Sequence, residues 1–201
     1  MTSAPDIVLA SASPRRRELL ERLGIPLIVV PSQIPETEQA GETPRQHVTR
    51  LSREKALEIA SRPEIRGRWF IGSDTIVLHD ETILGKPTDP GDAAAMLCSL
   101  SGREHQVLSG FAVHDRQSGT TVTEVVTTRV RFKELTATEI AGYIATGEPM
   151  DKAGAYAIQG LGVFMVRAIE GSFTNVVGLP LCELLEVLEG LGAIRLFASI
   201  P

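Results

Sequence analysis

The sequence predicts an α/β protein, because short apolar runs typical of strands alternate with segments that carry helix-start signals. The first such pair is the apolar run Ile7–Leu9, followed at once by a helix start at Ser13. The clearest helix begins at Thr43 and the most apolar strand at Trp69. A chain of 201 residues is long enough for one large domain or for a compact two-lobed unit.

The stretch Leu9–Glu18 predicts a helix start that binds an anion. Ser13 occupies the N-cap position and Pro14 the first helical position, where its missing N–H costs nothing. Ser11, Ser13, the N–H groups of the helix start and its positive dipole end form a natural anion cradle. The arginines Arg15–Arg17 oppose helix stability there unless an anion binds, so we expect the polyphosphate of a nucleotide. The alternative is an ordinary helix start in a protein rich in arginine.

A second strand is expected at Ile25–Val30, followed by a loop that contains Glu36. The next helix is expected over Thr43–Ser61. Thr43 and Gln46 have the spacing of a capping box, in which each side chain bonds the backbone N–H of the other residue. This helix therefore has a well-defined start.

Lys55 lies within the apolar stripe of this helix. At about 100° per residue, one narrow face carries Val48, Leu51 and Ile59, and Lys55 falls inside it. A buried ammonium is costly without a partner, so the position suggests a functional lysine with a charged partner. The alternative is a side chain that lies on apolar surface and extends its amine to water.

Asp74 lies within the apolar strand expected at Trp69–Leu78, which is interrupted by Gly72–Thr75. An ionised carboxylate flanked by hydrophobic residues needs a cation or hydrogen-bond donors. The weaker alternative is an acid at the end of a strand. We therefore expect Asp74 to have a functional partner.

A hairpin turn is expected at His79–Glu81, with a returning strand at Thr82–Leu84. If the turn is centred there, Lys86 comes roughly opposite Asp74 and Thr75. A carboxylate and an ammonium would then face one another at the end of the sheet.

The second half of the chain continues the alternation of helices and strands. His105 has no role assigned, because a lone histidine is more often structural than catalytic. The glycine-rich segment carries Lys152 and Gln159 and would let a ligand approach the backbone, although such segments also serve as connectors. The expected order is a helix from Asp89 to Gly102, strands His105–His114 and Thr120–Phe132, a helix from Thr136 to Gly147, the glycine-rich segment Gly147–Gly160, a strand Val163–Ile169, a loop Gly171–Gly178, a helix Pro180–Leu188 and a peripheral tail Ala193–Pro201.

Composition restricts the possible functions. The net charge of −5 argues against a general nucleic-acid binder, which needs a basic surface. The sequence contains no apolar run of membrane-spanning length, and Met1–Asp6 does not resemble a signal peptide. Cys98 and Cys182 lie in apolar helical segments, so we expect buried free thiols in a reducing cytoplasm.

The candidate residues together suggest nucleotide chemistry with a divalent metal. The chain has only four lysines, and three of them are the candidates Lys55, Lys86 and Lys152. With Arg15 and Arg16, these lysines would neutralise a triphosphate. Asp74 and Glu36 would supply oxygen ligands to Mg²⁺ or Mn²⁺, and a carboxylate that the metal leaves available would deprotonate water. The sequence has neither a G-x-x-x-x-G-K-[ST] phosphate loop nor a G-x-G-x-x-G fingerprint.

At this point the motifs are recognisable. The chain resembles the Maf family of nucleoside triphosphate pyrophosphatases from about Ile7 to Leu188, nearly its whole length. The combination is far more specific than any single motif. It consists of ASASPRR at Ala10–Arg16, SDT at Ser73–Thr75, GKP at Gly85–Pro87, DKAGAYAIQG at Asp151–Gly160 and NVVGLP at Asn175–Pro180.

This resemblance implies one Maf-like domain over residues 1–201, with a mixed twisted sheet, flanking helices and two lobes around a central cleft. It implies hydrolysis of dTTP or UTP to the monophosphate and pyrophosphate, with a divalent metal, in the cytoplasm; a homodimer is common in the family. Asp74 would match the proton acceptor. Arg15, Thr75 and Gln159 would match positions that govern substrate choice, and Lys55, Lys86 and Glu36 the phosphate and metal side.

Three departures from the family pattern concern Glu36, Ala157 and Ser109. The usual acidic pair of the loop is reduced to Glu36, which weakens the loop's share of metal binding. Ala157 replaces a glycine, which is tolerable only at negative φ. Ser109 stands where threonine is common. The alternatives that stay open are the same reaction on CTP or 7-methyl-GTP, a non-catalytic nucleotide sensor, and a partner-binding module of cell division.

Overall fold

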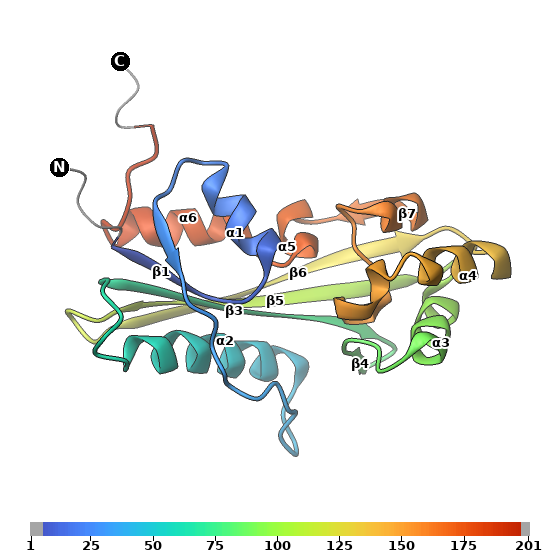
Figure 1. The fold of residues 1–201 in the computed structure, drawn as a ribbon, viewed down its shortest axis with the longest axis horizontal. Helices are drawn as coiled ribbons and strands as arrows, with labels where there is room; N and C mark the ends of the chain where they lie inside the picture. The colour runs from blue at the N-terminus through green and yellow to red at the C-terminus, as the bar shows by residue number, and fades with distance from the viewer. Residues whose placement is uncertain (1–5, 198–201) are drawn as a thin grey trace. The chain divides into compact units, whose positions relative to one another are not determined.

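The computed structural model describes residues 6–197 and divides into two compact units (Figure 1). Unit 1 comprises the described residues of Met1–Asp74, Ser109–Val125 and Gly178–Pro201, and unit 2 comprises Thr75–Leu108 and Val126–Val177. Three long strands contribute residues to both units. Each unit has its own core of buried hydrophobic residues. Residues 198–201 of the expected tail lie outside the described residues.

The sheet is mixed, as predicted. β1 pairs in parallel with β2 and β3, whereas β3 with β4 and β6 with β7 are antiparallel. The strand order is β2-β1-β3-β5-β6-β7, with β4 paired to β3. The strands are β1 (Ile7–Ala10), β2 (Leu27–Val29), β3 (Trp69–His79), β4 (Thr82–Leu84), β5 (Glu104–Asp115), β6 (Thr121–Phe132) and β7 (Val166–Glu170).

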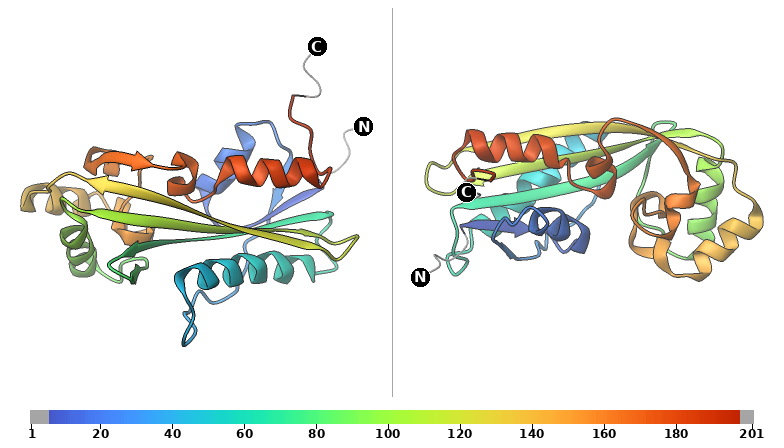
Figure 2. Two further views of the ribbon diagram at one scale, coloured as in Figure 1. Left: turned by 180° about the vertical axis from the view of Figure 1, so that it is seen from behind. Right: turned by 90° about the horizontal axis from the view of Figure 1, so that it is seen from above.

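Unit 1 has helices on both faces of its strands: α2 (Pro44–Ala60) on one face, and α1 (Pro14–Glu21) and α6 (Leu181–Gly190) on the other (Figures 1 and 2). Helix α2 lies directly on two glycines of the sheet, Gly72 on β3 and Gly110 on β5. A Cβ at Gly72 would lie 2.7 Å from the Ala56 amide nitrogen and closer still to the Ser52 carbonyl oxygen. This contact sets the distance between α2 and β3, which carry two of the candidate residues.

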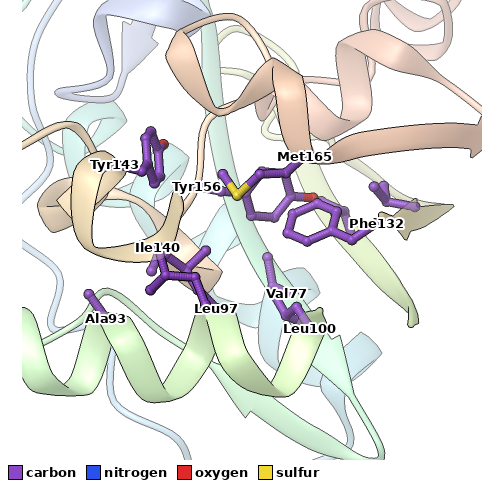
Figure 3. Close-up of a cluster of buried hydrophobic side chains, with 12 residues drawn as sticks. Val77, Ala93, Leu97, Leu100, Phe132, Ile140, Tyr143, Tyr156 and Met165 are labelled. Carbon is purple, nitrogen blue, oxygen red and sulfur yellow. The ribbon is translucent and has the colours of Figure 1, made fainter. Parts of the chain in front are cut away.

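Unit 2 has its own apolar core, drawn in Figure 3. Val77, Leu97, Phe132, Tyr156 and Met165 are all buried in it. Aromatic rings meet edge to face there, with ring centroids of Phe132 and Tyr156 4.8 Å apart. The helices of unit 2 are α3 (Pro90–Leu100), α4 (Ala137–Ala145), α5 (Phe173–Val177) and the 3₁₀ helices η1 (Glu148–Asp151), η2 (Ala153–Ala155) and η3 (Leu161–Met165).

Local signals predicted the helix starts well. The capping boxes at Thr43 and Thr136 are both formed, and the Asp89 side chain accepts a hydrogen bond from the Asp92 N–H. Ser13 is the N-cap of α1 by position, but its side chain makes no capping hydrogen bond. The turn between β3 and β4 consists of Asp80 and Glu81, both with positive φ, at the predicted place.

Several expected elements were wrong in detail. Strand β3 runs without a break through Gly72–Thr75, because both its faces are covered there. β7 begins at Val166 and not at Val163, since a 3₁₀ helix occupies Leu161–Met165. The expected loop Gly171–Gly178 contains α5, and the glycine-rich segment contains η1 and η2.

The expectation of buried thiols was also wrong. Both Cys98 and Cys182 are free and exposed. In α3 the buried positions are Ala93, Leu97 and Leu100, and Cys98 follows Leu97 by about 100° around the helix, off that face. Within residues 6–197, no helix combines the length and the apolar character needed to cross a bilayer.

Candidate active site

Lys55, Asp74 and Glu36 form a charged cluster within unit 1. The Lys55 ammonium nitrogen lies 2.7 Å from Asp74 Oδ1 and 2.6 Å from Glu36 Oε1. The side chains of Lys55 and Asp74 are each 7% exposed, whereas that of Glu36 is 49% exposed. The charged partner expected for the buried lysine is therefore present, and the alternative of an amine extended to water does not hold.

The positions of α2 and β3 explain this pairing. Lys55 shares the buried face of α2 with Val48, Leu51 and Ile59, which are fully buried, so its side chain is directed at the sheet. Asp74 lies on β3, two residues beyond Gly72, on which α2 packs. Glu36 reaches the same ammonium from the loop between β2 and α2. One cation thus holds together two carboxylates that would otherwise repel each other.

Arg16 joins α1 to two distant backbone segments of unit 1. Its Nε donates to the carbonyl oxygen of Gly178 and its Nη1 to that of Ser73, both at 2.7 Å. A further donation from Nη1 reaches Ser11 Oγ at 3.2 Å. Burial lowers the pKa of Arg16, and the nearby carboxylates of Asp74 and Glu36 oppose that shift. Through these contacts Arg16 attaches the start of α1 to the rest of unit 1, a structural role that the sequence did not predict.

The expected anion cradle is partly used by the protein itself. The buried Ser11 hydroxyl accepts from the Ser13 N–H at 3.2 Å as well as from Arg16. Arg17, by contrast, is exposed and pairs with Glu21 at 2.7 Å on the surface of α1. Arg15 is half-buried at the start of the same helix. Of the three arginines, Arg16 therefore bonds Ser11, Arg15 is partly covered, and Arg17 faces solvent.

The remaining candidates lie in unit 2. Thr75 is half-buried on β3, and Lys86 is exposed two residues beyond the end of β4. The register pairs Val77 with Leu84, so continuing it by two residues puts Lys86 opposite Thr75, close to the expected position. The Gly154 N–H donates to the carbonyl oxygen of Gly85 at 3.0 Å, which ties the glycine-rich segment to the chain beside Lys86.

Lys152 and Gln159 belong to the glycine-rich segment of unit 2. Lys152 forms an ion pair with Asp151, and Gln159 is exposed in a turn. Ala157, which replaces a family glycine, is absent from the positive-φ residues of the described chain, so its Cβ causes no backbone strain there. Within this segment, positive φ occurs instead at Gly147, Gly154 and Ala155.

Asp74 and Glu36 have the donor chemistry that a divalent metal requires. Hard cations such as Mg²⁺ and Mn²⁺ favour carboxylate oxygens, and Mg²⁺ is commonly held by one or two carboxylates with substrate phosphates and water. Within residues 6–197, no three or more His, Cys, Asp and Glu side chains are grouped to hold a metal ion. The Glu36 and Asp74 carboxylates, both in contact with the Lys55 ammonium, are two oxygen donors of the kind that such a cation takes.

A cavity of about 580 Å³ lies on unit 1, beside the first half of α2, and contains none of the candidate residues. Three arginines and two glutamates contribute to its lining, but Arg50 is already engaged by Glu42 and Glu54. The lining residues are Gln39, Ala40, Gly41, Glu42, Arg45, Gln46, Thr49, Arg50, Arg53 and Glu54.

Comparisons with known proteins agree with the motifs. The family model described as "Maf-like protein" matches residues 6–191. A protein of Syntrophotalea carbinolica named dTTP/UTP pyrophosphatase is 67% identical over 193 residues, which cover 96% of this chain and 88% of that protein. A protein of Geobacter sulfurreducens with the same name is 54% identical, covering 94% of this chain and 97% of its own length. A solved nucleoside-triphosphatase / dITP/XTP pyrophosphatase of Mycobacterium abscessus is 13% identical, with a TM-score of 0.42 and coverage of 97% and 99%.

Proposed function

The chain belongs to the Maf family, and we propose that it hydrolyses dTTP and UTP to the nucleoside monophosphate and pyrophosphate. One observation carries the chemistry of this proposal. The buried carboxylate of Asp74, which is the acid of the family's Ser-Asp-Thr motif on β3, forms an ion pair with the buried ammonium of Lys55 on α2. The pyrimidine preference rests on the names of the relatives that cover nearly all of this chain.

In this proposal Asp74 is the general base. Its Oδ1 accepts from Lys55, which fixes the carboxylate and leaves Oδ2 to accept a proton from water. The water oxygen forms a new bond to the α-phosphorus as the bond between that phosphorus and the oxygen bridging to the β-phosphorus breaks. Pyrophosphate leaves with the bridging oxygen, and the proton passes to Asp74. A positioned general base such as Asp74 contributes typically about 10²–10⁴-fold to the rate.

The cations and hydroxyls have the complementary role of binding substrate. Ser11, Arg15 and Arg16 would bind phosphate oxygens at the start of α1, where N–H groups and the helix dipole also favour an anion. Lys55, Lys86 and Lys152 would add positive charge along the triphosphate. Arg15, Thr75 and Gln159 would select the nucleotide.

Glu36 and Asp74 would hold the divalent metal, Mg²⁺ or Mn²⁺. When bound, the metal neutralises charge that develops on the phosphate oxygens. Lys55 would release at least one carboxylate oxygen to it, and the high exposure of Glu36 makes that carboxylate the easier one to release. We also propose that residues 1–201 act as one Maf-like domain, in the cytoplasm. A homodimer remains a prediction.

The experiment that tests this function measures pyrophosphate release from a panel of nucleoside triphosphates with Mg²⁺ or Mn²⁺. We expect dTTP and UTP to be the fastest substrates. Faster release from CTP or 7-methyl-GTP would mean that this nucleotide, and not dTTP or UTP, is the substrate. Binding without any turnover would favour a nucleotide sensor. Absence of nucleotide affinity would favour a partner-binding module.

The Asp74→Asn variant tests the base. It should lose turnover by about 10²–10⁴-fold and still bind triphosphate. The control is Glu58→Gln, which changes another carboxylate of unit 1 and should keep normal turnover. Glu58 lies on α2 and pairs with Arg62 just beyond the end of that helix. Normal turnover in Asp74→Asn would contradict the assignment of the base.

A further inference from the structure

The glycine-rich segment of unit 2 is closed into a loop by one carboxylate at its start. Glu148 Oε2 accepts from the Leu161 N–H at 2.9 Å, and Glu148 Oε1 accepts from the Gly162 N–H at 3.1 Å. These bonds join residues thirteen and fourteen positions apart. Lys152 and Gln159, both proposed to bind substrate, lie between the joined ends.

Tyr143 on α4 strengthens the same junction. Its hydroxyl donates to Glu148 Oε1 at 2.9 Å and accepts from the Ala157 N–H at 3.2 Å. Burial, followed by the hydrogen bond to Glu148, raises the pKa of Tyr143, so the hydroxyl keeps its proton and remains a donor. The segment is therefore held at Leu161, at Gly162 and, through Tyr143, at Ala157.

The two glycines at the junction allow Glu148 and Tyr143 to approach the backbone closely. A Cβ at Gly160 would lie 2.5 Å from the carboxyl carbon of Glu148, and one at Gly162 would lie 2.8 Å from the Tyr143 hydroxyl. Both distances are shorter than a real Cβ contact allows, so a side chain at either position would force the carboxylate or the hydroxyl to move. The glycines thus complement Glu148 and Tyr143.

Glu148 is well suited to act as an anion at this place. Burial raises the pKa of Glu148, but the hydrogen bonds from the Leu161 and Gly162 N–H groups and from Tyr143, with the nearby Lys152, outweigh it and lower the pKa overall. An ionised carboxylate makes stronger hydrogen bonds to backbone N–H groups than a neutral acceptor does.

The middle of the loop has a separate anchor. The buried Tyr156 hydroxyl lies 2.8 Å from His105 Nε2, and the two rings meet edge to face with centroids 5.4 Å apart. Tyr156 also contacts Phe132 in the core of unit 2. With its centre fixed in this way, the freedom of Gln159 depends on the short stretch between Tyr156 and the junction at Leu161.

We propose that Glu148 is a positioning residue for nucleotide selection, which holds Gln159 and Lys152 in place by closing the loop from Glu148 to Gly162. This inference rests on the proposed function and deepens it. Glu148 does not touch the substrate in this role; it fixes the backbone two residues beyond Gln159. Loss of the junction should therefore weaken discrimination between bases more than it slows the chemical step.

The variant that tests this is Glu148→Gln, which keeps the size of the side chain but replaces one acceptor oxygen with an NH₂ group. We expect KM for UTP to rise about tenfold and kcat to change less than about threefold, because loop positioning affects binding more than chemistry. The ratio of kcat/KM for UTP to that for CTP should fall about tenfold. Amide hydrogen exchange without nucleotide should become faster at residues 157–162.

The matched control is Glu139→Gln, also in unit 2. Glu139 likewise accepts from a backbone N–H, that of Thr136, and from a side chain, Lys133, but outside the loop. It should leave the UTP to CTP ratio and the exchange of residues 157–162 unchanged. A fall of the ratio in both variants would indicate general destabilisation and overturn the proposal.

Tyr143→Phe is a second variant in case Glu148→Gln fails to fold. It removes one donor from Glu148 and the acceptor for the Ala157 N–H, and should lower the same ratio by a smaller factor. An unchanged ratio with unchanged exchange in a folded variant would overturn the positioning role. A wild-type protein without turnover would overturn the proposed function and with it the role in base selection, whereas faster loop exchange in the variant would still establish the junction itself.

Discussion

Lys55 and Asp74 form a buried ion pair, 2.7 Å long, between a helix and a strand that are nineteen residues apart at these positions. The ammonium is shared with Glu36, so it compensates two carboxylates at once. Removal of the ammonium would leave Asp74 buried without its ion-pair partner. The consequences for stability and for catalysis can be separated by substitution.

Lys55→Met should lower the free energy of unfolding by about 3 kcal/mol, because it leaves a buried carboxylate uncompensated beside a second one. Urea denaturation followed by circular dichroism measures this loss. In the double variant Lys55→Met with Asp74→Leu, most of the stability should return, since both buried charges are then absent. Equal losses in the single and double variants would contradict the pairing argument.

Arg16→Lys should destabilise the protein by about 1–3 kcal/mol. The guanidinium donates to the carbonyl oxygens of Gly178 and Ser73 in two directions, and a lysine ammonium does not reproduce that fork. Thermal denaturation checks the effect. Arg17→Lys is the control, because its exposed pair with Glu21 should contribute only about 0.5 kcal/mol or less.

Gly72→Ala should both destabilise the protein and reduce activity. The new Cβ would overlap the Ser52 carbonyl oxygen, so α2 must move away from β3, and Lys55 must move with it. Overpacking of this kind costs about 1–3 kcal/mol, and more when only backbone can give way.

Gly142→Ala provides the opposite control. Gly142 is exposed on α4, and a Cβ added there would meet only open space, so alanine should stabilise the helix by about 0.5–1 kcal/mol. Pyrophosphate release at saturating nucleotide should be normal in Gly142→Ala and reduced in Gly72→Ala. Normal activity in both would contradict the link between helix packing and the ion pair.

The stability of the protein should depend on Glu42 at acid pH. Hydrogen bonds from Arg50, assisted by His47, lower the pKa of Glu42 from 4.5 to about 2. The unfolded chain therefore takes up this proton at higher pH than the folded chain. The stabilisation is complete above about pH 4.5 and is lost as the pH falls toward 2.

Urea denaturation between neutral pH and pH 3 tests this dependence. Glu42→Gln should be less stable at neutral pH and should show a flatter decline below pH 4.5 than the wild type. Glu21→Gln removes an exposed carboxylate and should keep the wild-type slope. A wild-type slope in Glu42→Gln would assign the acid sensitivity to other groups.

The elements that sequence predicted well are those fixed by neighbours along the chain. The capping boxes at Thr43 and Thr136 need residues only three positions apart, and the turn at Asp80 and Glu81 is equally local. The need for a partner at Lys55 also followed from the local helical period, because a charge on an apolar face is costly wherever it occurs.

The features that sequence missed depend on distant segments. Arg16 was expected to bind an anion, but its contacts to Gly178 and Ser73 join positions 162 and 57 residues away. The role of Glu148 was not predicted, since its partners are mainly backbone N–H groups, which do not depend on the type of residue. Helix α5 was missed for a different, local reason: it is only five residues long, which is too short for a periodic signal.

The two exposed cysteines, Cys98 in unit 2 and Cys182 in unit 1, give the natural sequence one attachment point for a dye in each unit. The nearby Glu186 carboxylate raises the pKa of the Cys182 thiol, so a maleimide reacts more slowly there than with an ordinary thiol. Donor and acceptor fluorophores can therefore be attached in sequence without introducing any new residue. Energy transfer between them would follow, in real time, whether adding a nucleotide draws the two halves of the chain together.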